Sequence, residues 1–337
     1  MTEETRITLQ TGAGGAKMHE FLNKIGCEKL GIPEKFMETD SFTFKAGKKN
    51  YNFTTDMFVV TPLFFNGGDI GKLSVCGTVN DLITGGAKPL YLALALVIEE
   101  GFLEEELFKI LKSIKDTAKE AGVEIVTGDT KVVRRGECDG CFICTTGIGE
   151  QILKNRPNPA RVEDGDIIII TGTIGDHSVA ILEAREEFGI KTGISSDCAS
   201  LNKPFLEVFE SGIDCKFLRD PTRGGLASVL NELVLSSDSR IEIFEKNVPV
   251  RKEVVGFCEL TGLDYLNLAN EGKMVIVIKE KEKDKTLDIL KKHRLTEEAD
   301  VIGRISKKEK PVVILHTAIG STRIVPFPVG ELLPRIC

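Results

Sequence analysis

The last residue of the chain is a cysteine, and a terminal thiol is the residue here with the clearest chemical potential. The chain ends Pro334-Arg335-Ile336-Cys337. Three prolines after Ser321 predict an extended, mobile tail that has the reach to carry a group on this thiol. The neighbouring Arg335 predicts a lowered thiol pKa and a larger thiolate fraction. Prenylation is disfavoured, because that signal needs the cysteine four residues from the end.

Four short motifs place acidic residues beside glycines or polar residues, each at the end of an expected strand or the start of an expected helix. They are Thr54-Thr55-Asp56, Asn80-Asp81, Thr127-Gly128-Asp129-Thr130-Lys131 and Asp220-Pro221-Thr222-Arg223-Gly224-Gly225. Carboxylate oxygens are the ligands that Mg²⁺ accepts beside nucleotide phosphates. Glycines let backbone N–H groups approach phosphate oxygens, and helix N-termini favour anions. Each motif alone is more typical of a turn or a helix cap, but together they predict a Mg-nucleotide site between two domains.

The glycine-rich segments do not follow a standard nucleotide fingerprint. Residues 12–17 lack the spacing of a P-loop, and no GxGxxG follows a strand. The best candidate for an ATP segment is 66–84, where a flexible loop containing Lys72 precedes a helix that ends near Asn80 and Asp81.

Two segments offer a candidate general base. Asp176-His177 follows an apolar strand, and Asn270-Glu271-Gly272-Lys273 precedes another. An imidazole or a carboxylate at such a position suits proton transfer, although a capping histidine and a plain turn explain the same residues.

Cys138, Cys141 and Cys144 suggest a metal site by their spacing. They supply three ligands rather than four, and in a strand Cys141 faces away from the other two. We therefore favour half-buried strand cysteines over a metal centre.

The 337 residues exceed the size at which one hydrophobic core usually stops growing, so we expect two domains. The patterns predict an α+β chain of two α/β domains, each a mixed sheet covered by helices, with a flexible C-terminal tail. The expected parts are an N-terminal segment (1–38), a first domain (39–155), a second domain (156–320) and the tail (321–337). Expected helices are 18–30, 72–84, 104–121, 178–187, 201–211 and 225–235; expected strands are a hairpin within 42–60, then 90–98, 124–126, 141–148, 167–170, 274–278 and 312–315.

Composition narrows the class of protein. A net charge of −7, from 51 acidic and 44 basic residues, disfavours nucleic acids and anionic membranes as partners. The longest apolar stretch, 90–98, is less than half of a membrane span, and the start lacks a signal peptide. Nine cysteines, an odd number, suit a reducing compartment. We expect a cytoplasmic protein.

Taken together, these motifs resemble the HypE family of hydrogenase maturation proteins, which are carbamoyl dehydratases of the aminoimidazole ribonucleotide synthetase-like (AIR synthase-like) superfamily. The resemblance spans nearly the whole chain, and its most specific part is the Pro-Arg-Ile-Cys ending. The cysteine triplet is not part of the family pattern. The segments that carry the resemblance are 12–15, 55–56, 62–65, 67–73, 76–81, 128–133, 175–177, 222–225, 270–273 and 334–337.

The resemblance implies a homodimer formed by the N-terminal domains, with ATP and Mg²⁺ bound between the halves of the chain. It implies that a carbamoyltransferase, HypF, loads a carbamoyl group on the terminal thiol. ATP-dependent dehydration then gives a thiocyanate, whose cyano group passes to iron on a HypC–HypD scaffold for [NiFe] hydrogenase.

On this basis each candidate residue receives an expected role. Cys337 is the substrate carrier, Glu271 the base, and His177 the second choice for the base. Lys131 neutralises phosphate charge or orients the carbamoyl oxygen. The expected Mg²⁺ ligands are Asp56, Asp81, Asp129 and Asp220, and the remaining expected ATP contacts are Lys72, Asn80, Thr127, Gly128, Thr222, Arg223, Gly224 and Gly225.

Three other hypotheses stay open at this point. One is an ATP-dependent enzyme of the same fold that acts on a free small-molecule amide. Another is a non-catalytic metal or iron–sulfur carrier that uses the cysteine triplet. The third is an assembly scaffold whose tail only docks a partner.

Overall fold

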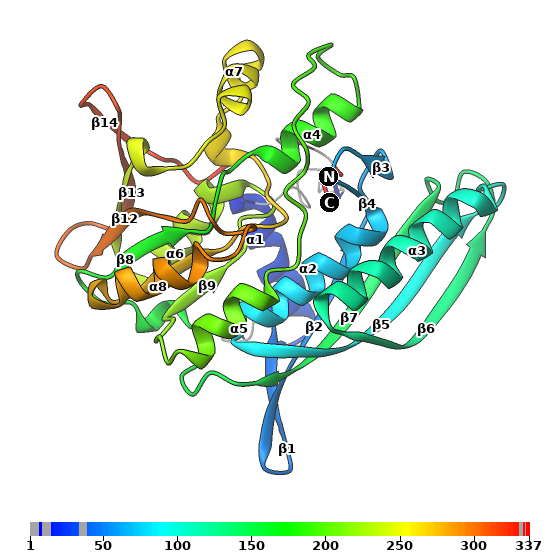
Figure 1. Ribbon diagram of the computed structural model, residues 1–337, viewed down its shortest axis with the longest axis horizontal. Coiled ribbons are helices and arrows are strands. Elements are labelled where there is room, and N and C mark those ends of the chain that lie inside the picture. The colour runs from blue at the N-terminus through cyan, green and yellow to red at the C-terminus, as the bar shows by residue number, and fades with distance from the viewer. Residues whose placement is uncertain (1–6, 9–14, 34–38, 330–332, 334) are drawn as a thin grey trace, which may run out of the picture.

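Two sheet-and-helix units make up the chain (Figure 1). The computed structural model describes residues 7–8, 15–33, 39–329, 333 and 335–337. Gly12, Gly14 and Pro334 therefore lie outside the described residues. The described N-terminal segment contains α1 (Gly15–Asn23) and a π-helical stretch, η2 (Lys24–Lys29), where sequence periodicity predicted one helix over 18–30.

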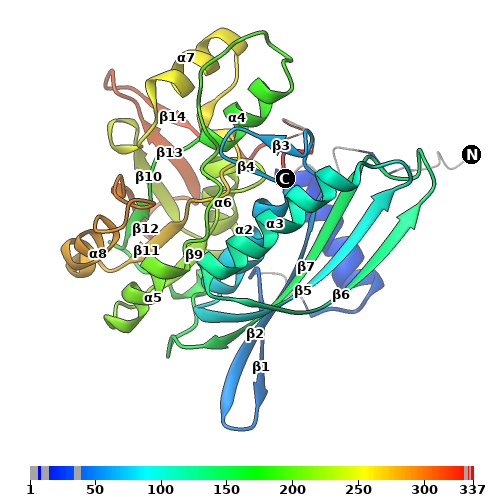
Figure 2. The same cartoon turned by 45° about the vertical axis from the view of Figure 1, so that its right-hand side comes forward.

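The first unit is a five-stranded sheet in the order β1-β2-β7-β5-β6. All neighbouring strands are antiparallel except β5 and β6, which run parallel because α3 connects them. Helices α2 and α3 cover one face (Figure 2). The elements are β1 (Phe42–Ala46), β2 (Lys49–Phe58), β3 (Phe64–Phe65), β4 (Gly68–Asp69), α2 (Ile70–Thr84), β5 (Ala87–Glu99), α3 (Glu104–Ala121), β6 (Glu124–Val133) and β7 (Cys141–Gln151).

The second unit is a seven-stranded sheet in the order β14-β13-β10-β12-β8-β11-β9. Its strand β8 is four consecutive isoleucines, all buried, because α6 packs on one face of the sheet and α5 and α8 pack on the other. The longer elements are β8 (Ile167–Ile170), α4 (Asp176–Ala184), α5 (Asn202–Glu210), β9 (Phe217–Arg219), α6 (Gly225–Ser237), β10 (Arg240–Phe244), α7 (Lys252–Thr261), β11 (Val275–Ile278), α8 (Lys283–Leu290), β12 (Asp300–Ser306), β13 (Val312–His316) and β14 (Thr322–Ile324). Short 3₁₀ turns are η4 (Pro159–Arg161), η5 (Glu245–Asn247), η6 (Tyr265–Asn267) and η7 (Glu280–Glu282).

Helix α2 lies at the junction of the two units, and nearly all of its residues are buried. A helix that is apolar or small on every side is typical of a position enclosed from all directions. The segment 193–202 of the second unit runs along it. Asn66 Nδ2 donates to Ile194 O at 3.0 Å, and Asn80 Nδ2 donates to Ala199 O at 3.0 Å. These contacts fix the relative position of the loops that approach the N-terminal unit.

The structure corrects several sequence predictions. Strand β6 continues to Val133, so the motif 127–131 lies within a strand and not in a turn after it. Thr322–Ile324 form β14, an edge strand antiparallel to β13, where an extended tail was predicted. Strands β9, β10 and β12 were not predicted, because short strands between polar loops carry little periodic signal. Helices α7 and α8 were not predicted either. Among the described residues, no helix combines the length and the apolar character needed to cross a bilayer.

Asp69 is the N-cap of α2. Its carboxylate accepts hydrogen bonds from the N–H groups of Gly71 at 2.7 Å and Lys72 at 3.0 Å. We expect Asp69→Ala to lower the free energy of unfolding by about 1 kcal/mol, the usual cost of losing an N-cap. Urea titration followed by circular dichroism measures the change. Asp69→Asn keeps an accepting oxygen and serves as the matched control, so equal losses in the two variants would contradict the capping role.

Candidate active site

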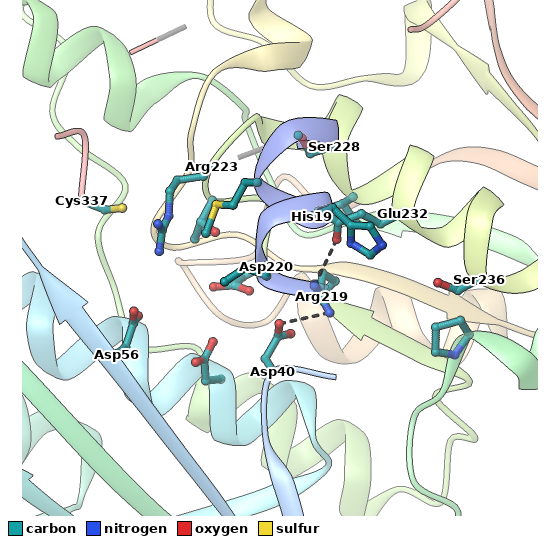
Figure 3. A pocket seen from close by; sticks show the side chains of 18 of the residues that line it. His19, Asp40, Asp56, Arg219, Asp220, Arg223, Ser228, Glu232, Ser236 and Cys337 are labelled. Atoms are coloured by element: carbon teal, nitrogen blue, oxygen red, sulfur yellow. Dashed lines mark hydrogen bonds and ion pairs between the residues drawn. The ribbon is translucent and has the colours of Figure 1, made fainter. Parts of the chain in front are cut away.

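A pocket of about 500 Å³ lies where the two units and the C-terminus meet (Figure 3). A volume of this size is ordinary for a small-molecule site. Its wall combines β2 and α2 of the first unit with α6 and the loops before it, and α1 lies across one side. The sequence-predicted residues that line it are Asp56, Asp81, Asp220, Thr222, Arg223, Glu271 and Cys337.

The last three residues of the chain are docked beside this pocket. The backbone N–H of Val59 donates to Cys337 O at 3.1 Å, and that of Thr61 donates to Arg335 O at 3.2 Å. The Ile336 side chain is only 3% exposed and packs into the core of the first unit. The docked tail presents the Cys337 sulfur toward Arg223 (Figure 3).

The environment of the Cys337 thiol differs from the sequence prediction. Burial raises the pKa of Cys337 to about 12, and Arg223 opposes that rise. Arg335, which was predicted to lower this pKa, instead donates to Val59 O at 2.8 Å and pairs with Asp139. The docked thiol therefore carries its proton at neutral pH, and the facing cation is Arg223.

Glu271 lies on the loop before β11 and faces the same pocket. Its backbone N–H donates to Asp197 Oδ1 at 3.0 Å, and its carbonyl accepts from Asn80 Nδ2 at 3.3 Å. Burial raises the pKa of Glu271 well above its usual value, and the charges of Asp220 and Asp197 raise it further. Its Oε1 has no hydrogen-bond partner among the described residues. A desolvated carboxylate with a free oxygen is suited to accept a proton.

His177 lies at the start of α4 and is fully buried. Its Nε2 is 2.8 Å from Ile336 O, and its Nδ1 is 2.8 Å from Ser196 Oγ. Because a carbonyl only accepts, Nε2 carries the proton and Nδ1 accepts from the serine hydroxyl. Burial lowers the pKa of His177, so the ring is neutral. Both ring nitrogens are thus engaged in holding the tail, which favours Glu271 over His177 as the group free to take a proton.

Three carboxylates form a cluster on the wall of the pocket. Asp40, Asp81 and Asp220 each place one oxygen within 4.8 Å of the other two. Desolvation, together with the charge of Asp40, raises the pKa of Asp220 to about 7. Desolvation likewise raises the pKa of Asp81 well above its usual value, with Asp220 adding to the rise. An all-oxygen set of mutually repelling carboxylates fits a hard divalent cation.

The cluster differs from the predicted ligand set at three residues, since it includes Asp40 and lacks Asp56 and Asp129. Asp40 was missed, because it stands alone before β1 without a glycine or a periodic flank. Asp56 faces the same pocket, and burial raises its pKa, but it is not one of the three grouped oxygens. Asp129 lies elsewhere, on β6.

The end of β9 and the loop between β9 and α6 supply the arginines of the pocket. Arg219, which was also missed, pairs with Asp40 at 3.1 Å and with Glu232 at 3.1 Å. The facing groups of Cys337, Asp56 and Glu271 raise the pKa of Arg223. Asn270 braces this loop, since its Nδ2 donates to the carbonyl of Pro221 at 3.0 Å.

Two glycines allow the tight entry into α6. Gly224 and Gly225 both have positive φ, 75° and 59°. A Cβ at Gly225 would lie 2.4 Å from Leu268 O, so only glycine fits there. The helix N-terminus beside Thr222 therefore opens into the pocket, a position that favours anions.

The predicted ATP segment 66–84 is only partly in the pocket. Within it, Gly77 and Asp81 line the wall, whereas Lys72 donates to the Gly67 carbonyl at 2.9 Å and is not among the lining residues. Asn80 binds the backbone of a neighbouring loop, since its Oδ1 accepts a hydrogen bond from Leu201 N–H at 2.9 Å. The glycine-rich loop packs against segment 193–196, so its glycines serve close packing.

The motif on β6 is not brought to this pocket. Within the described chain, Thr127, Gly128, Asp129 and Lys131 all lie on an exposed edge strand. Lys131 Nζ pairs with Asp129 at 2.7 Å, and both side chains are about two-thirds exposed, 68% and 65%. Any contact of these residues with a pocket like this one requires another copy of the chain.

The cysteine triplet forms no cluster with metal-binding geometry. In the described part of the chain, the only group of three or more His, Cys, Asp or Glu residues close enough to share an ion is the carboxylate cluster. Cys141 is buried on β7 while Cys144 keeps some exposure, as opposite strand faces require. This observation removes the support for the metal-carrier hypothesis.

Comparison with known proteins identifies the family. Residues 39–151 match the N-terminal domain of AIR synthase related proteins, and residues 163–316 match the C-terminal domain. A protein named carbamoyl dehydratase HypE from Rhodobacter capsulatus is 42% identical over 337 residues, covering 99% of each chain. The chain belongs to the HypE family. A hydrogenase expression/formation protein of Methanocaldococcus jannaschii is 45% identical over 98% of this HypE-family chain and 100% of its own length.

Solved HypE structures share the whole fold. The chain in a HypE–HypF complex superposes with a TM-score of 0.86 at 44% identity, over 91% of this chain and 99% of that one. HypE in complex with ATP gives a TM-score of 0.82 at 38% identity, over 98% and 100%. A thiamine monophosphate kinase from Aquifex aeolicus, at 16% identity and a TM-score of 0.66, shares the fold alone. The predicted fold class and the predicted family are confirmed.

Proposed function

We propose that the chain is an ATP-dependent carbamoyl dehydratase that acts on an S-carbamoyl group carried by its own Cys337 and converts it to a thiocyanate. The observation that carries this proposal is the docked C-terminus, which places Cys337 in one pocket with Arg223 and Glu271. A pocket that already contains the chain's own terminal thiol is suited to a substrate attached to that thiol. The relatives named carbamoyl dehydratase support the reaction class.

The chemistry balances with ATP as the second substrate. The carbamoyl oxygen attacks the γ-phosphorus, the bond to the bridging oxygen breaks, and ADP leaves. One N–H proton is lost as the nitrogen forms a double bond to carbon. Loss of the second N–H proton with cleavage of the carbon–oxygen bond then releases phosphate and forms the C≡N group. The products are the thiocyanate, ADP, phosphate and one proton, with no change in oxidation state.

Different groups of the pocket have separate roles in this reaction. Glu271 accepts a nitrogen proton, because its carboxylate is desolvated and has a free oxygen. Arg223 stabilises charge on the oxygen that receives the phosphoryl group. Backbone N–H groups at the start of α6, beside Gly224, favour the phosphates. The relative solved with ATP supports ATP as the nucleotide.

The carboxylate cluster fits Mg²⁺. Asp40, Asp81 and Asp220 offer oxygen ligands only. Desolvation raises the pKa of Asp81 and of Asp220, and the charge of Asp40 adds to both rises. Mg²⁺ held there would supply positive charge to the nucleotide phosphates. Asp56 lies close enough to contribute to the same charge balance.

The proposed partners follow from the chemistry and from the relatives. A carbamoyltransferase, HypF, would load Cys337, and the solved HypE–HypF complex supports this partner. A HypC–HypD iron scaffold would receive the cyano group for [NiFe] hydrogenase.

We also propose a homodimer through the first unit. The β6 strand is an exposed edge, and the sheet exposes large apolar side chains of β2 and β5 such as Met57 and Tyr91. A second copy would cover these side chains and would bring Asp129 and Lys131 to its partner's pocket, which gives those two residues their proposed roles.

Intact-protein mass spectrometry tests the proposed function. The full chain is incubated with the partner carbamoyltransferase, carbamoyl phosphate and Mg-ATP, and its C-terminal peptide is mapped. We expect a carbamoyl adduct on Cys337 that loses one water only when ATP is present. Failure to form the adduct with a carbamoyltransferase active on another substrate would refute the self-modified tail and favour an enzyme acting on a free amide.

Replacing one carboxylate of the cluster tests the cation site by stability. Asp220 has a raised folded pKa, so the stability it contributes is present below its usual pKa and is lost as pH rises through about 7. We therefore expect Asp220→Asn to raise the melting temperature of the metal-free chain at pH 8 by a few degrees and to change it little at pH 4.

The same variant should respond weakly to Mg²⁺. Loss of one anionic ligand is expected to weaken Mg²⁺ binding by about tenfold or more, so the rise in melting temperature on adding Mg²⁺ shrinks. Differential scanning fluorimetry with and without Mg²⁺ measures both effects. Asp164→Asn, at an exposed ion pair of the second unit, is the control. An undiminished Mg²⁺ response in Asp220→Asn would place the cation elsewhere.

A further inference from the structure

The docked tail is held by its main-chain carbonyls. His177 Nε2 donates to Ile336 O at 2.8 Å, and Arg185 Nη2 donates to Arg335 O at 2.7 Å. The two donors come from one element, because His177 is in the first turn of α4 and Arg185 is its C-cap. Two successive peptide groups of the tail are therefore fixed by one helix of the second unit.

Arg185 also joins the tail to the segment after β2 on which the tail docks. Its Nε donates to Thr61 O at 2.7 Å, while Thr61 N–H donates to Arg335 O at 3.2 Å. The guanidinium thus bridges residue 61 and residue 335, and its side chain is only 9% exposed. A planar fork with several donors can span two carbonyls in this way, which a lysine ammonium cannot reproduce.

We propose that His177 and Arg185 are positioning residues that fix the register of the docked tail and so place the Cys337 sulfur against Arg223 and Glu271. The inference rests on the proposed function, in which Cys337 carries the substrate. Neither residue is within the reacting group, so neither is catalytic.

Because the tail is held by its backbone carbonyls, its docked position does not depend on the group attached to the thiol. The donors contact residues 335 and 336 and not the cysteine side chain, so the same register serves the free thiol, the S-carbamoyl form and the thiocyanate. The Ile336 side chain, buried in the core of the first unit, reinforces that register. A one-residue slip would put Arg335 or Cys337 in the place of Ile336 and would displace the sulfur from its position.

Thiol alkylation measures the docking directly. Docked Cys337 is partly buried and its thiol carries its proton, so iodoacetamide reacts with it faster when the tail is released. A hydrogen bond from a charged donor is stronger than a neutral one, and its loss is expected to shift the docking equilibrium about tenfold. Arg185→Met keeps the aliphatic stem and removes the donors. We expect Cys337 alkylation in this variant to be about tenfold faster than in the parent chain.

Two controls separate positioning from general loosening. Glu187→Gln removes the ion-pair partner of Arg185, 3.5 Å away, and leaves both carbonyl contacts, so Cys337 alkylation should match the parent chain. Cys215, buried in the second unit, reports on unfolding in every variant, and its alkylation should not change. His177→Phe, which keeps a ring without a donor, should accelerate Cys337 alkylation in the same direction as Arg185→Met.

A second measurement connects the docking to catalysis. With the S-carbamoyl chain, Arg185→Met should dehydrate more slowly than the parent while accepting the carbamoyl group at an undiminished rate. Unchanged Cys337 alkylation in Arg185→Met, or a parallel rise at Cys215, would overturn the proposal. If the parent chain itself forms no thiocyanate, the proposed function fails, and the alkylation comparison still decides whether Arg185 holds the tail.

Discussion

A Cys337→Ala chain will bind ATP as the parent chain does but will accept no carbamoyl group and form no thiocyanate. The substitution removes only the sulfur atom. The tail should still dock, because it is held by the carbonyls of residues 335–337 and by Ile336. The carboxylate cluster and the start of α6 are untouched, so the nucleotide affinity should stay within about twofold, the range of a surface change. Without the Cys337 sulfur to carry the carbamoyl group, no thiocyanate can form.

Two measurements check this prediction on the same samples. Calorimetric titration with Mg-ATP gives the affinity, and intact-protein mass spectrometry after incubation with the carbamoyltransferase gives the adduct. Cys144→Ala, which removes another partly exposed thiol, should be carbamoylated like the parent chain. A carbamoyl adduct on Cys337→Ala would assign the carrier role to another residue and return the free-amide enzyme to consideration.

The sequence identified several residues of the candidate site, but it could not show that they lie together in space. Asp56, Asp220, Glu271 and Cys337 come from four separate segments, and the structure brings them to one pocket. Each acidic motif alone is more typical of a turn or a helix cap, so the sequence signal came from their combination with one another and with the terminal thiol. The family pattern then assigned each a role that no local feature could supply.

Other residues of the pocket gave no such signal. Asp40 completes the carboxylate cluster only because β1 and the loop before α6 approach each other, and Arg219 balances it from the end of β9. Asp197, which supports Glu271, lies in the irregular segment that runs along α2. Residues that act through tertiary contacts of this kind have no periodicity or motif by which a sequence reveals them.

The prediction about Arg335 failed for a geometric reason. Arg335 was expected to act on the thiol because it is close in the sequence, and in an extended tail the side chains of residues two apart would share a face. Arg335 has φ 49°, a left-handed conformation that breaks this alternation. Its guanidinium instead lies over the Phe142 ring, 5.6 Å from the centroid, and pairs with Asp139. The charge that faces the thiol comes from Arg223, more than a hundred residues earlier in the chain.

Glu271→Gln will lower the rate of dehydration by about 10²–10⁴-fold, the usual contribution of a positioned general base, and will leave carbamoylation of Cys337 intact. Glutamine keeps the size of the side chain and cannot accept the nitrogen proton. Single-turnover conversion of the S-carbamoyl chain, followed by mass spectrometry, isolates the step. His177→Gln is the comparison, because it keeps a donor for Ile336 O and removes the imidazole. A larger loss in His177→Gln than in Glu271→Gln would reverse the assignment of the base.

The pH profile tests the same role without removing the carboxylate. Burial raises the pKa of Glu271, and the charges of Asp220 and Asp197 raise it further. A base works only after it has lost its proton, so the rate should climb as pH rises through this elevated pKa. Asp197→Asn keeps an oxygen to accept the Glu271 N–H and removes one negative charge, so the acid limb should move to lower pH. The charge of Asp197 also raises the pKa of His177, so the comparison of the two candidate bases decides the assignment. An acid limb that persists in Glu271→Gln but disappears in His177→Gln would show that the imidazole, and not Glu271, takes the proton.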